Sequence, residues 1–450
     1  MARSENKMGT MPVKKLIISM SLPMMISMLV QALYNVVDSI YVARLSEEAL
    51  TAVTMAFPLQ NLMIALGSGT GVGINALLSR SLGEKRFDQS DAAANNGLLL
   101  TFFSYLAFLI IGLFVSGPFI RTQTQNPVLA ADGTTYLRIV CCMSLGLFFQ
   151  MTFERLLQST GRTVYSMISQ AAGAVINIIF DPLLIFGLAG FPKLGVAGAA
   201  IATVLGQACA AVIGLILNLR KNPDIHFSFK SVLSPDIRII RDIYRVGIPS
   251  ILMMSIGSAM TYMMNLILHT FSETAIAVFG VYFKLQSFFF MPVFGLNNGL
   301  IPVLAYNYGA RNSQRIKEAL RFAMMLAGSI MLAGTLVFEL FPALLLRLFD
   351  ASEDMLAIGV PALRIICVIF PIAGVCIAMG SVFQAFGKSM YSLVVSIGRQ
   401  LVILIPAAWL LSRLRNVNLV WLAFPIAEVV SLLISLWFYR KIHREIIDRL

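Results

Sequence analysis

The fold of this chain is decided by two stretches, FPLQNLMIALGSGTGVGINALLSRSLG at residues 57–83 and FKLQSFFFMPVFGLNNGLIPVLAYNYG at residues 283–309. They lie 226 residues apart and share a Phe, a Leu-Gln pair and three glycines in register. The same offset holds without a gap from residue 23 to residue 166. Chance does not keep one register over that length, so the chain consists of two copies in the same order.

The composition places both copies in a membrane. Apolar residues make up 58% of the chain and charged residues only 12%, against about 25% charged residues in a soluble protein. Apolar runs of 20 or more residues recur, and each can cross a hydrocarbon core of about 30 Å as a helix. The alternating ten-residue strands of a membrane barrel are absent. The predicted fold class is therefore all-α and integral to the membrane.

The apolar runs predict twelve membrane-spanning helices, six in each copy. Their expected ranges are 16–40, 51–78, 92–116, 134–157, 164–187, 195–219, 243–268, 275–303, 318–341, 358–384, 391–411 and 418–439. An even number per copy makes the copies parallel repeats, related by a pseudo-two-fold axis along the membrane normal, which is a common build of secondary transporters. The polar, proline-containing segment 219–241 is the predicted cytoplasmic linker, between a six-helix lobe at 1–218 and another at 242–450.

Lysine and arginine predict the orientation of the chain. Of the 34 basic residues, 24, from Arg3 to Arg449, fall on the side that receives both termini, and 8 fall on the other. The excess places both termini in the cytoplasm of a cell-membrane protein. Because the basic residues are spread over short loops, the net charge of +12 is explained by this topology and by anionic lipid, and nucleic acid is not an expected partner.

Burying a charge in a bilayer is costly, so an ionisable residue within an apolar run indicates a functional or structural role. Asp38 ends the first run, and Asn177 and Asp181 lie four apart on one face of the fifth. Their equivalents in the second copy are apolar, so this set does not serve the shared fold. Two nearby carboxylates would share a proton or bind a hard cation such as Na⁺. The alternative is that Asp38 caps a helix end and Asp181 reaches outward.

The second copy carries its own polar set. Lys284, Arg399 and Glu428 fall in three of its apolar runs, and either a structural ion pair or a transport role would explain them. In the first copy, Glu154 and Arg155 are expected to form a structural pair at a helix end.

Methionine is concentrated in the first run of each copy, and its flexible thioether suits surfaces that accept many shapes. The candidate substrate-binding residues on these two runs are Met28, Gln31, Asn35, Met254 and Met260. The alternative for each methionine is packing or contact with lipid. The glycine-rich segment 67–73 has no strand before it, so close helix packing explains it better than a nucleotide site.

Several motifs together resemble the multidrug and toxic compound extrusion (MATE) family. They are Pro23 and Gln31 with Asp38, the glycine-rich helix ending in SRSLG at 79–83, QSTG at 158–161, Asn177 to Asp181, GVAGAAIAT at 195–203, FQAFG at 383–387 and WLAFP at 421–425. The resemblance covers nearly the whole chain and is greatest to the bacterial MepA-like and DinF-like branch. It implies two six-helix lobes around a cleft and antiport of cationic, amphipathic drugs against Na⁺ or H⁺.

The resemblance also implies a cation site. The family places an Asp on its first helix, an Asn and an Asp on its fifth and a Thr on its sixth, and these match Asp38, Asn177, Asp181 and Thr203. Some members carry an acidic residue in the seventh helix, but this sequence has none between 243 and 268. A second-lobe ion site of that type is therefore not expected.

Other functions remain as alternatives. A flippase for lipid-linked precursors, from the same superfamily, would need more basic residues in the cleft than Lys284 and Arg399. A membrane enzyme would need a nucleophile with a base, or metal ligands, and the three histidines lie in loops or at helix ends. No Walker A motif is present. The chain is therefore expected to act without a cofactor, as a monomer in lipid, on cationic drugs or toxic metabolites, and not as an enzyme.

Overall fold

A computed structural model describes residues 5–450 and shows an all-helical protein, without a strand in that range. Arg3, counted above among the basic residues, lies outside the described residues. Ten described helices are long and apolar enough to span a membrane, and two bent helix pairs bring the number to twelve when each pair is one span. The predicted fold class is therefore confirmed.

The first half of the chain contains six spans and two short helices. Its elements are α1 (Lys7–Thr10), α2 (Val13–Leu45), α3 (Glu47–Gly83), α4 (Phe87–Phe114), α5 (Ser116–Arg121), α6 (Pro127–Cys142), α7 (Leu145–Ser159), α8 (Thr163–Phe186) and α9 (Val196–Lys221). Between the halves lies the short helix α10 (Phe229–Val232).

The second half repeats this order. Its elements are α11 (Ile237–His269), α12 (Glu273–Gly309), α13 (Ser313–Leu340), α14 (Pro342–Arg347), α15 (Glu353–Cys367), α16 (Phe370–Ala385), α17 (Ser389–Ile397), the π-helix η1 (Gly398–Leu404), α18 (Ile405–Ser412), α19 (Val417–Val420), α20 (Ala423–Glu445) and the 3₁₀-helix η2 (Ile447–Arg449). Helix α11 begins at Ile237, within the predicted linker 219–241. The side chain of Asp236 caps it by accepting a hydrogen bond from the Arg238 N–H.

The repeat extends to helix ends and bends. Both ends of α3 and α12, and both ends of α4 and α13, differ by 226 residues. The hydroxyls of Ser46 and Ser272 cap the first pair by accepting from the third backbone N–H beyond them. The spans predicted at 134–157 and 358–384 are instead each broken, with bends of 46° between α6 and α7 and 48° between α15 and α16. The two copies therefore share one backbone plan.

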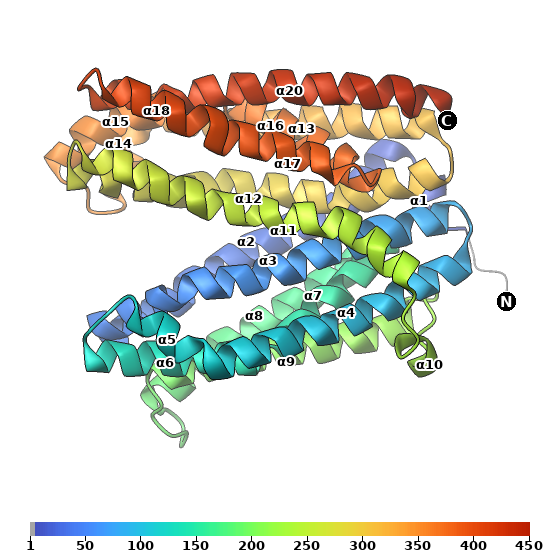
Figure 1. Ribbon diagram of the computed structural model, residues 1–450, viewed down its shortest axis with the longest axis horizontal. Coiled ribbons are helices and arrows are strands. Elements are labelled where there is room, and N and C mark those ends of the chain that lie inside the picture. The colour runs from blue at the N-terminus through green and yellow to red at the C-terminus, as the bar shows by residue number, and fades with distance from the viewer. Residues whose placement is uncertain (1–4) are drawn as a thin grey trace.

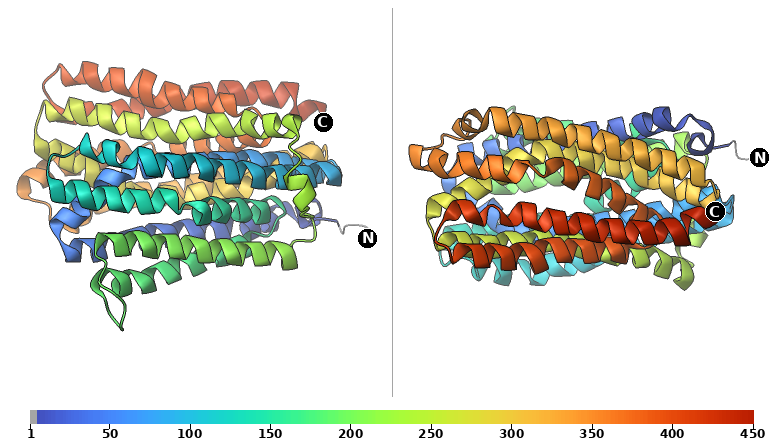
Figure 2. Two further views of the ribbon diagram at one scale, coloured as in Figure 1. Left: turned by 60° about the horizontal axis from the view of Figure 1, so that its bottom comes forward. Right: turned by 90° about the horizontal axis from the view of Figure 1, so that it is seen from above.

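The long helices run side by side along one axis, as two further views show (Figure 2). Both termini lie at the same end of the molecule, and α2 and α3 cross α11 and α12 toward that end (Figure 1). At the opposite end the ribbons of these four helices lie apart. The crossing is therefore the main meeting place of the two halves.

Repeat-equivalent glycines allow this crossing. A side-chain carbon at Gly69 of α3 would lie 2.8 Å from the backbone nitrogen of Ile251 in α11. At the equivalent Gly295 of α12, it would lie 2.6 Å from the backbone nitrogen of Met25 in α2. The sequence prediction that the glycine-rich segment serves close packing therefore agrees with the structure, and the packing joins the halves.

Buried polar contacts supplement the glycines. The guanidinium of Arg155 on α7 donates to Oδ1 of Asn298 on α12 at 3.1 Å and to the hydroxyl of Ser68 on α3 at 3.3 Å. The pairing of Arg155 with Glu154 expected from the sequence is wrong, because Glu154 accepts instead from the Gln150 amide at 2.9 Å. Arg155 thus links the two halves.

The N-terminal segment bridges both halves at the end that carries the termini. The amide of Asn6 donates to the Thr160 carbonyl of the first half at 2.9 Å. The Met8 carbonyl accepts from the Asn307 amide at 3.1 Å and from the Arg315 guanidinium at 3.0 Å, both in the second half. Hydrogen bonds to both halves therefore hold the N-terminal segment across the crossing.

Gly83→Ala tests the glycine contact, because its added methyl group would overlap the Tyr306 carbonyl of α12. Backbone cannot yield as a flexible side chain can, so we expect a loss of about 1–3 kcal/mol in stability, measured as a lower melting temperature in detergent. Gly280→Ala on α12 is the matched control, since no atom lies within 4 Å of its added carbon. Equal melting temperatures for the two variants would contradict the contact.

Candidate functional site

The first half brings the four predicted ion-site residues together. Asp38 lies late on α2, Asn177 and Asp181 lie one turn apart on α8, and Thr203 lies on α9. The Asn177 amide donates to the Thr203 hydroxyl at 3.3 Å. The carboxyl groups of Asp38 and Asp181 are close enough to interact electrostatically. We call these four side chains the acidic site.

Two glycines bring the helices of the acidic site into contact. A side-chain carbon at Gly206 of α9 would lie 2.7 Å from the Gly173 carbonyl of α8 and 3.0 Å from Cβ of Asn177. The backbone of α9 therefore packs directly on α8 at this level, which sets Thr203 beside Asn177.

The acidic site has unused hydrogen-bond acceptors. Asp181 is fully buried, and neither of its carboxyl oxygens has a donor among residues 5–450. One oxygen of Asp38 and the amide oxygen of Asn177 are also buried without a donor. Buried acceptors without partners are costly, and two ionised carboxylates side by side in low dielectric repel each other. A proton or a hard cation would relieve both costs.

Two tyrosines beside the acidic site were missed from the sequence. Tyr34 lies one turn before Asp38 on α2, and Tyr136 on α6 is near enough to interact electrostatically with both carboxyl groups. The spacing of Tyr34 and Asp38 was a usable signal, because residues four apart share a helix face. Tyr136 offered no such signal, because it comes from a helix that only the tertiary fold places there.

The candidate substrate residues are dispersed. The Gln31 side-chain oxygen accepts from the Gln170 amide at 3.0 Å, Met28 is half-buried and Asn35 is exposed, all on α2. Met254 on α11 is 46% exposed, whereas Met260 is 7% exposed and lines a cavity within the second half. The structure does not gather these five residues into one site, and their role in binding stays a prediction.

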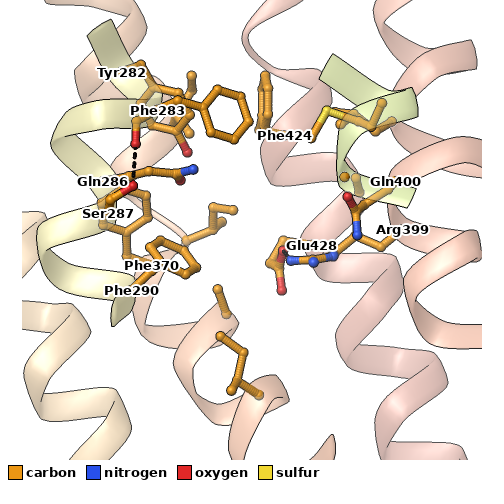
Figure 3. Close-up of a pocket in the computed structure, with 18 of the residues that line it drawn as sticks. Tyr282, Phe283, Gln286, Ser287, Phe290, Phe370, Arg399, Gln400, Phe424 and Glu428 are labelled. Atoms are coloured by element: carbon orange, nitrogen blue, oxygen red, sulfur yellow. Dashed lines mark hydrogen bonds and ion pairs between the residues drawn. The ribbon is translucent and has the colours of Figure 1, made fainter. Parts of the chain in front are cut away.

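The cavity in the second half holds two of the three residues of the predicted second polar set. It measures about 300 Å³ and is lined from α11, α12, α15, α16, η1 and α20. Arg399 on η1 donates to one carboxyl oxygen of Glu428 on α20 at 3.2 Å (Figure 3). Lys284 lies apart on the exposed side of α12, with its ammonium 6.0 Å from the centre of the Phe349 ring. The prediction that Lys284 belongs to the same polar set as Arg399 and Glu428 was therefore wrong. The location of a residue in an apolar run does not show which face of the helix it occupies.

The chain is similar to known proteins over nearly its whole length. The MatE family model matches residues 23–183 and 249–410, one segment in each copy of the repeat. The multidrug export protein MepA of Staphylococcus haemolyticus is 27% identical over 446 residues, which cover 97% of this chain and 95% of that protein. MepA of Staphylococcus aureus is 26% identical over 94% of this chain and 93% of its own length.

Solved structures agree in the fold over the whole chain. The outward-facing conformation of a multidrug resistance MATE family transporter of the MOP superfamily has a TM-score of 0.92 and 26% identity, with all of both chains covered. A MOP superfamily transporter from Pyrococcus furiosus, described as having a reversed polarity of its binding pocket, has a TM-score of 0.91 and 26% identity over 98% of each chain.

Thr203→Val tests the packing of the acidic site. The change keeps the shape of the side chain but removes the hydroxyl that accepts from the buried Asn177 amide. We expect a loss of about 1–3 kcal/mol in stability, the cost of an unpartnered buried group, measured by thermal melting. The control is Thr54→Val on α3, an exposed threonine whose hydroxyl bonds only its own helix. A melting temperature for Thr203→Val equal to that of the control would contradict the assigned hydrogen bond.

Proposed function

This chain belongs to the MatE family of membrane transporters, and we propose that it exports cationic amphipathic compounds in exchange for Na⁺ or H⁺. The observation that carries the proposal is the acidic site, in which Asp38 and Asp181 both have buried carboxyl oxygens without a hydrogen-bond donor. The MepA relatives, which are multidrug export proteins, support drugs as the substrates.

The acidic site supplies the coupling ion with a binding place. Asp38, Asp181 and Asn177 offer carboxyl and amide oxygens, and the Thr203 hydroxyl lies beside them. Oxygen ligands of this kind suit Na⁺, and the same carboxyl pair can take a proton instead. Either ion neutralises buried charge on α2 and α8 and so changes the packing that these helices prefer. No enzyme chemistry is part of the proposal.

Exchange follows if the ion and the drug favour different packings of the two halves. The halves meet where glycines of α3 pack on α11 and glycines of α12 pack on α2, so they can move as bodies about this crossing. Binding at equilibrium must then be reciprocal: the drug weakens ion binding by the factor by which the ion weakens drug binding. We place both termini, and hence the crossing, on the cytoplasmic side of the cell membrane, as the distribution of basic residues indicates.

Asp38→Asn should abolish concentrative efflux while the protein stays folded, because the amide cannot take up a proton or balance a cation. The measurement is drug efflux in proteoliposomes with a Na⁺ gradient and a pH gradient imposed separately, which also distinguishes the coupling ion. The control Asp88→Asn removes an exposed carboxylate at the start of α4 and should transport as the wild type does. Transport at wild-type rate against a gradient by Asp38→Asn would remove the acidic site from the coupling.

The methionines of α2 and α11 are proposed to provide a broad apolar surface for the drug. Met28→Ala combined with Met254→Ala should shift the relative efflux of differently shaped drugs without stopping transport, since flexible thioethers adapt to many shapes. The measurement is efflux of a drug panel, normalised to the amount of protein in the membrane. An unchanged profile would leave both residues as packing or lipid contacts.

A further inference from the structure

The cavity in the second half combines an aromatic wall with two opposite charges. Tyr282, Phe283 and Phe290 of α12 and Phe424 of α20 line it together with Arg399 and Glu428. The side-chain amide of Gln286 faces the ion pair from the opposite wall (Figure 3). Such a surface suits a flat apolar body with polar groups at one end.

Both charged groups retain unused hydrogen-bonding capacity. The Glu428 side chain is only 6% exposed. One of its carboxyl oxygens accepts a hydrogen bond from Arg399, and the other is buried without a donor. Within residues 5–450, the Arg399 side chain makes this one hydrogen bond, while a guanidinium has five donors. A buried oxygen of this kind is costly unless something binds it, so it indicates a ligand position in the cavity.

The repeat explains why the second half has a cavity here. In the first half, α8 and α9 meet closely at Gly173, Gly198 and Gly206, where any added carbon would overlap the facing helix. The residues 226 positions later are Arg399, Phe424 and Leu432. Large side chains replace glycine at all three contacts, so the corresponding helices cannot pack as closely, and two of the three replacements line the cavity.

The local backbone differs in the same place. Residues 398–404 form a π-helix, whereas the equivalent residues in the first half belong to the regular α-helix α8. Short π-helical segments are uncommon and occur frequently at functional sites. Arg399 and Gln400, adjacent in sequence at the start of this segment, both line the cavity. Side chains and backbone therefore diverge from the first half together, at the point where the cavity opens.

The charge balance selects the ligand. Arg399 and Glu428 together carry no net charge, so a guest with one unbalanced charge would leave a net charge beside the buried Glu428, which low dielectric disfavours. A guest with a cationic and an anionic group leaves the total at zero. Its ammonium can bond the free oxygen of Glu428 while its anionic group bonds the free N–H groups of Arg399.

We propose that this cavity binds amphipathic aromatic zwitterions, molecules of about 300 Å³ or less that carry both a protonated amine and an anionic group. The inference rests on the proposed export function and extends its substrates: beside cationic compounds, the protein takes amphipathic amines that also carry an acid, and these bind in this cavity. The acidic site takes the coupling ion, and the aromatic cavity takes the zwitterion, apart from the methionine surface proposed for cationic drugs.

Three probes with one aromatic body test the selection: naphthylalanine (a zwitterion), naphthylethylamine (a cation) and naphthylpropionate (an anion). Binding to the purified full chain in lipid nanodiscs is measured by calorimetry at neutral pH. The wild type should bind the zwitterion about ten-fold more tightly than either singly charged probe. Preference for the cation, equal binding of all three, or no binding would overturn the proposal.

Charge changes in the cavity should invert the selection. Glu428→Gln leaves Arg399 unbalanced, so naphthylpropionate should become the best ligand, and Arg399→Gln should favour naphthylethylamine in the same way. Removing one partner of a buried pair can prevent folding, whereas removing both is tolerated. The double variant Arg399→Gln with Glu428→Gln therefore serves as the second test. Its affinities for the three probes should agree within about two-fold. Persistence of the zwitterion preference in the double variant would contradict the role of the pair.

The matched control is Lys284→Gln, which removes an exposed charge from α12 outside the cavity and should leave the three affinities unchanged. The test is independent of the coupling mechanism, because binding without a gradient does not require the acidic site to work. Loss of ion coupling with intact zwitterion binding would refute the antiport but not the cavity. Intact coupling with no zwitterion binding would refute the cavity alone.

Discussion

Contact between bare backbones at the crossing of the halves is the constraint on which the rest of the structure depends. Lipid tails are as apolar as leucine, so helices in a membrane gain little by hiding apolar side chains from them, and close packing must hold the halves together. Gly69 and Gly73 of α3 meet α11, and their repeat equivalents Gly295 and Gly299 of α12 meet α2. Each contact has a symmetric counterpart, so the crossing forms one interface on which both halves turn.

The sequence predicted this scaffold well because repetition is visible without structure. One offset identified the paired helices and the shared glycines, and apolar length identified the spans. The bends within two spans were not predicted, because apolar residues continue through both breaks and periodicity does not report an angle. The contacts of α1 were not predicted either, since hydrogen bonds from Asn307 and Arg315 hold it, and these lie some 300 residues away in sequence.

The polar sites could be predicted where their residues share one helix face or match a motif of the family. Asn177 and Asp181 are four apart, which fixes their common face. Asp38 was recognisable as a carboxylate within an apolar run, and Thr203 follows from the resemblance. Lys284, Arg399 and Glu428 lay in three separate helices, and only packing could show that two of them meet while Lys284 faces outward. The asymmetry between the copies was the most useful sequence signal, because both sites lie where the repeat breaks.

Two helices that pack on each other connect the two sites. Helix α2 carries Asp38 and packs on α12, where Met25 lies against Gly295 and the Ser21 hydroxyl donates to the Leu296 carbonyl at 3.4 Å. The same stretch of α12 lines the cavity of the second half with Phe290 and Phe294. Exchange requires that the ion and the organic molecule favour different arrangements of this helix pair. At the glycine contact, the backbones of α2 and α12 touch directly. A shift of α2 on ion binding must therefore displace α12, and with it the wall of the cavity.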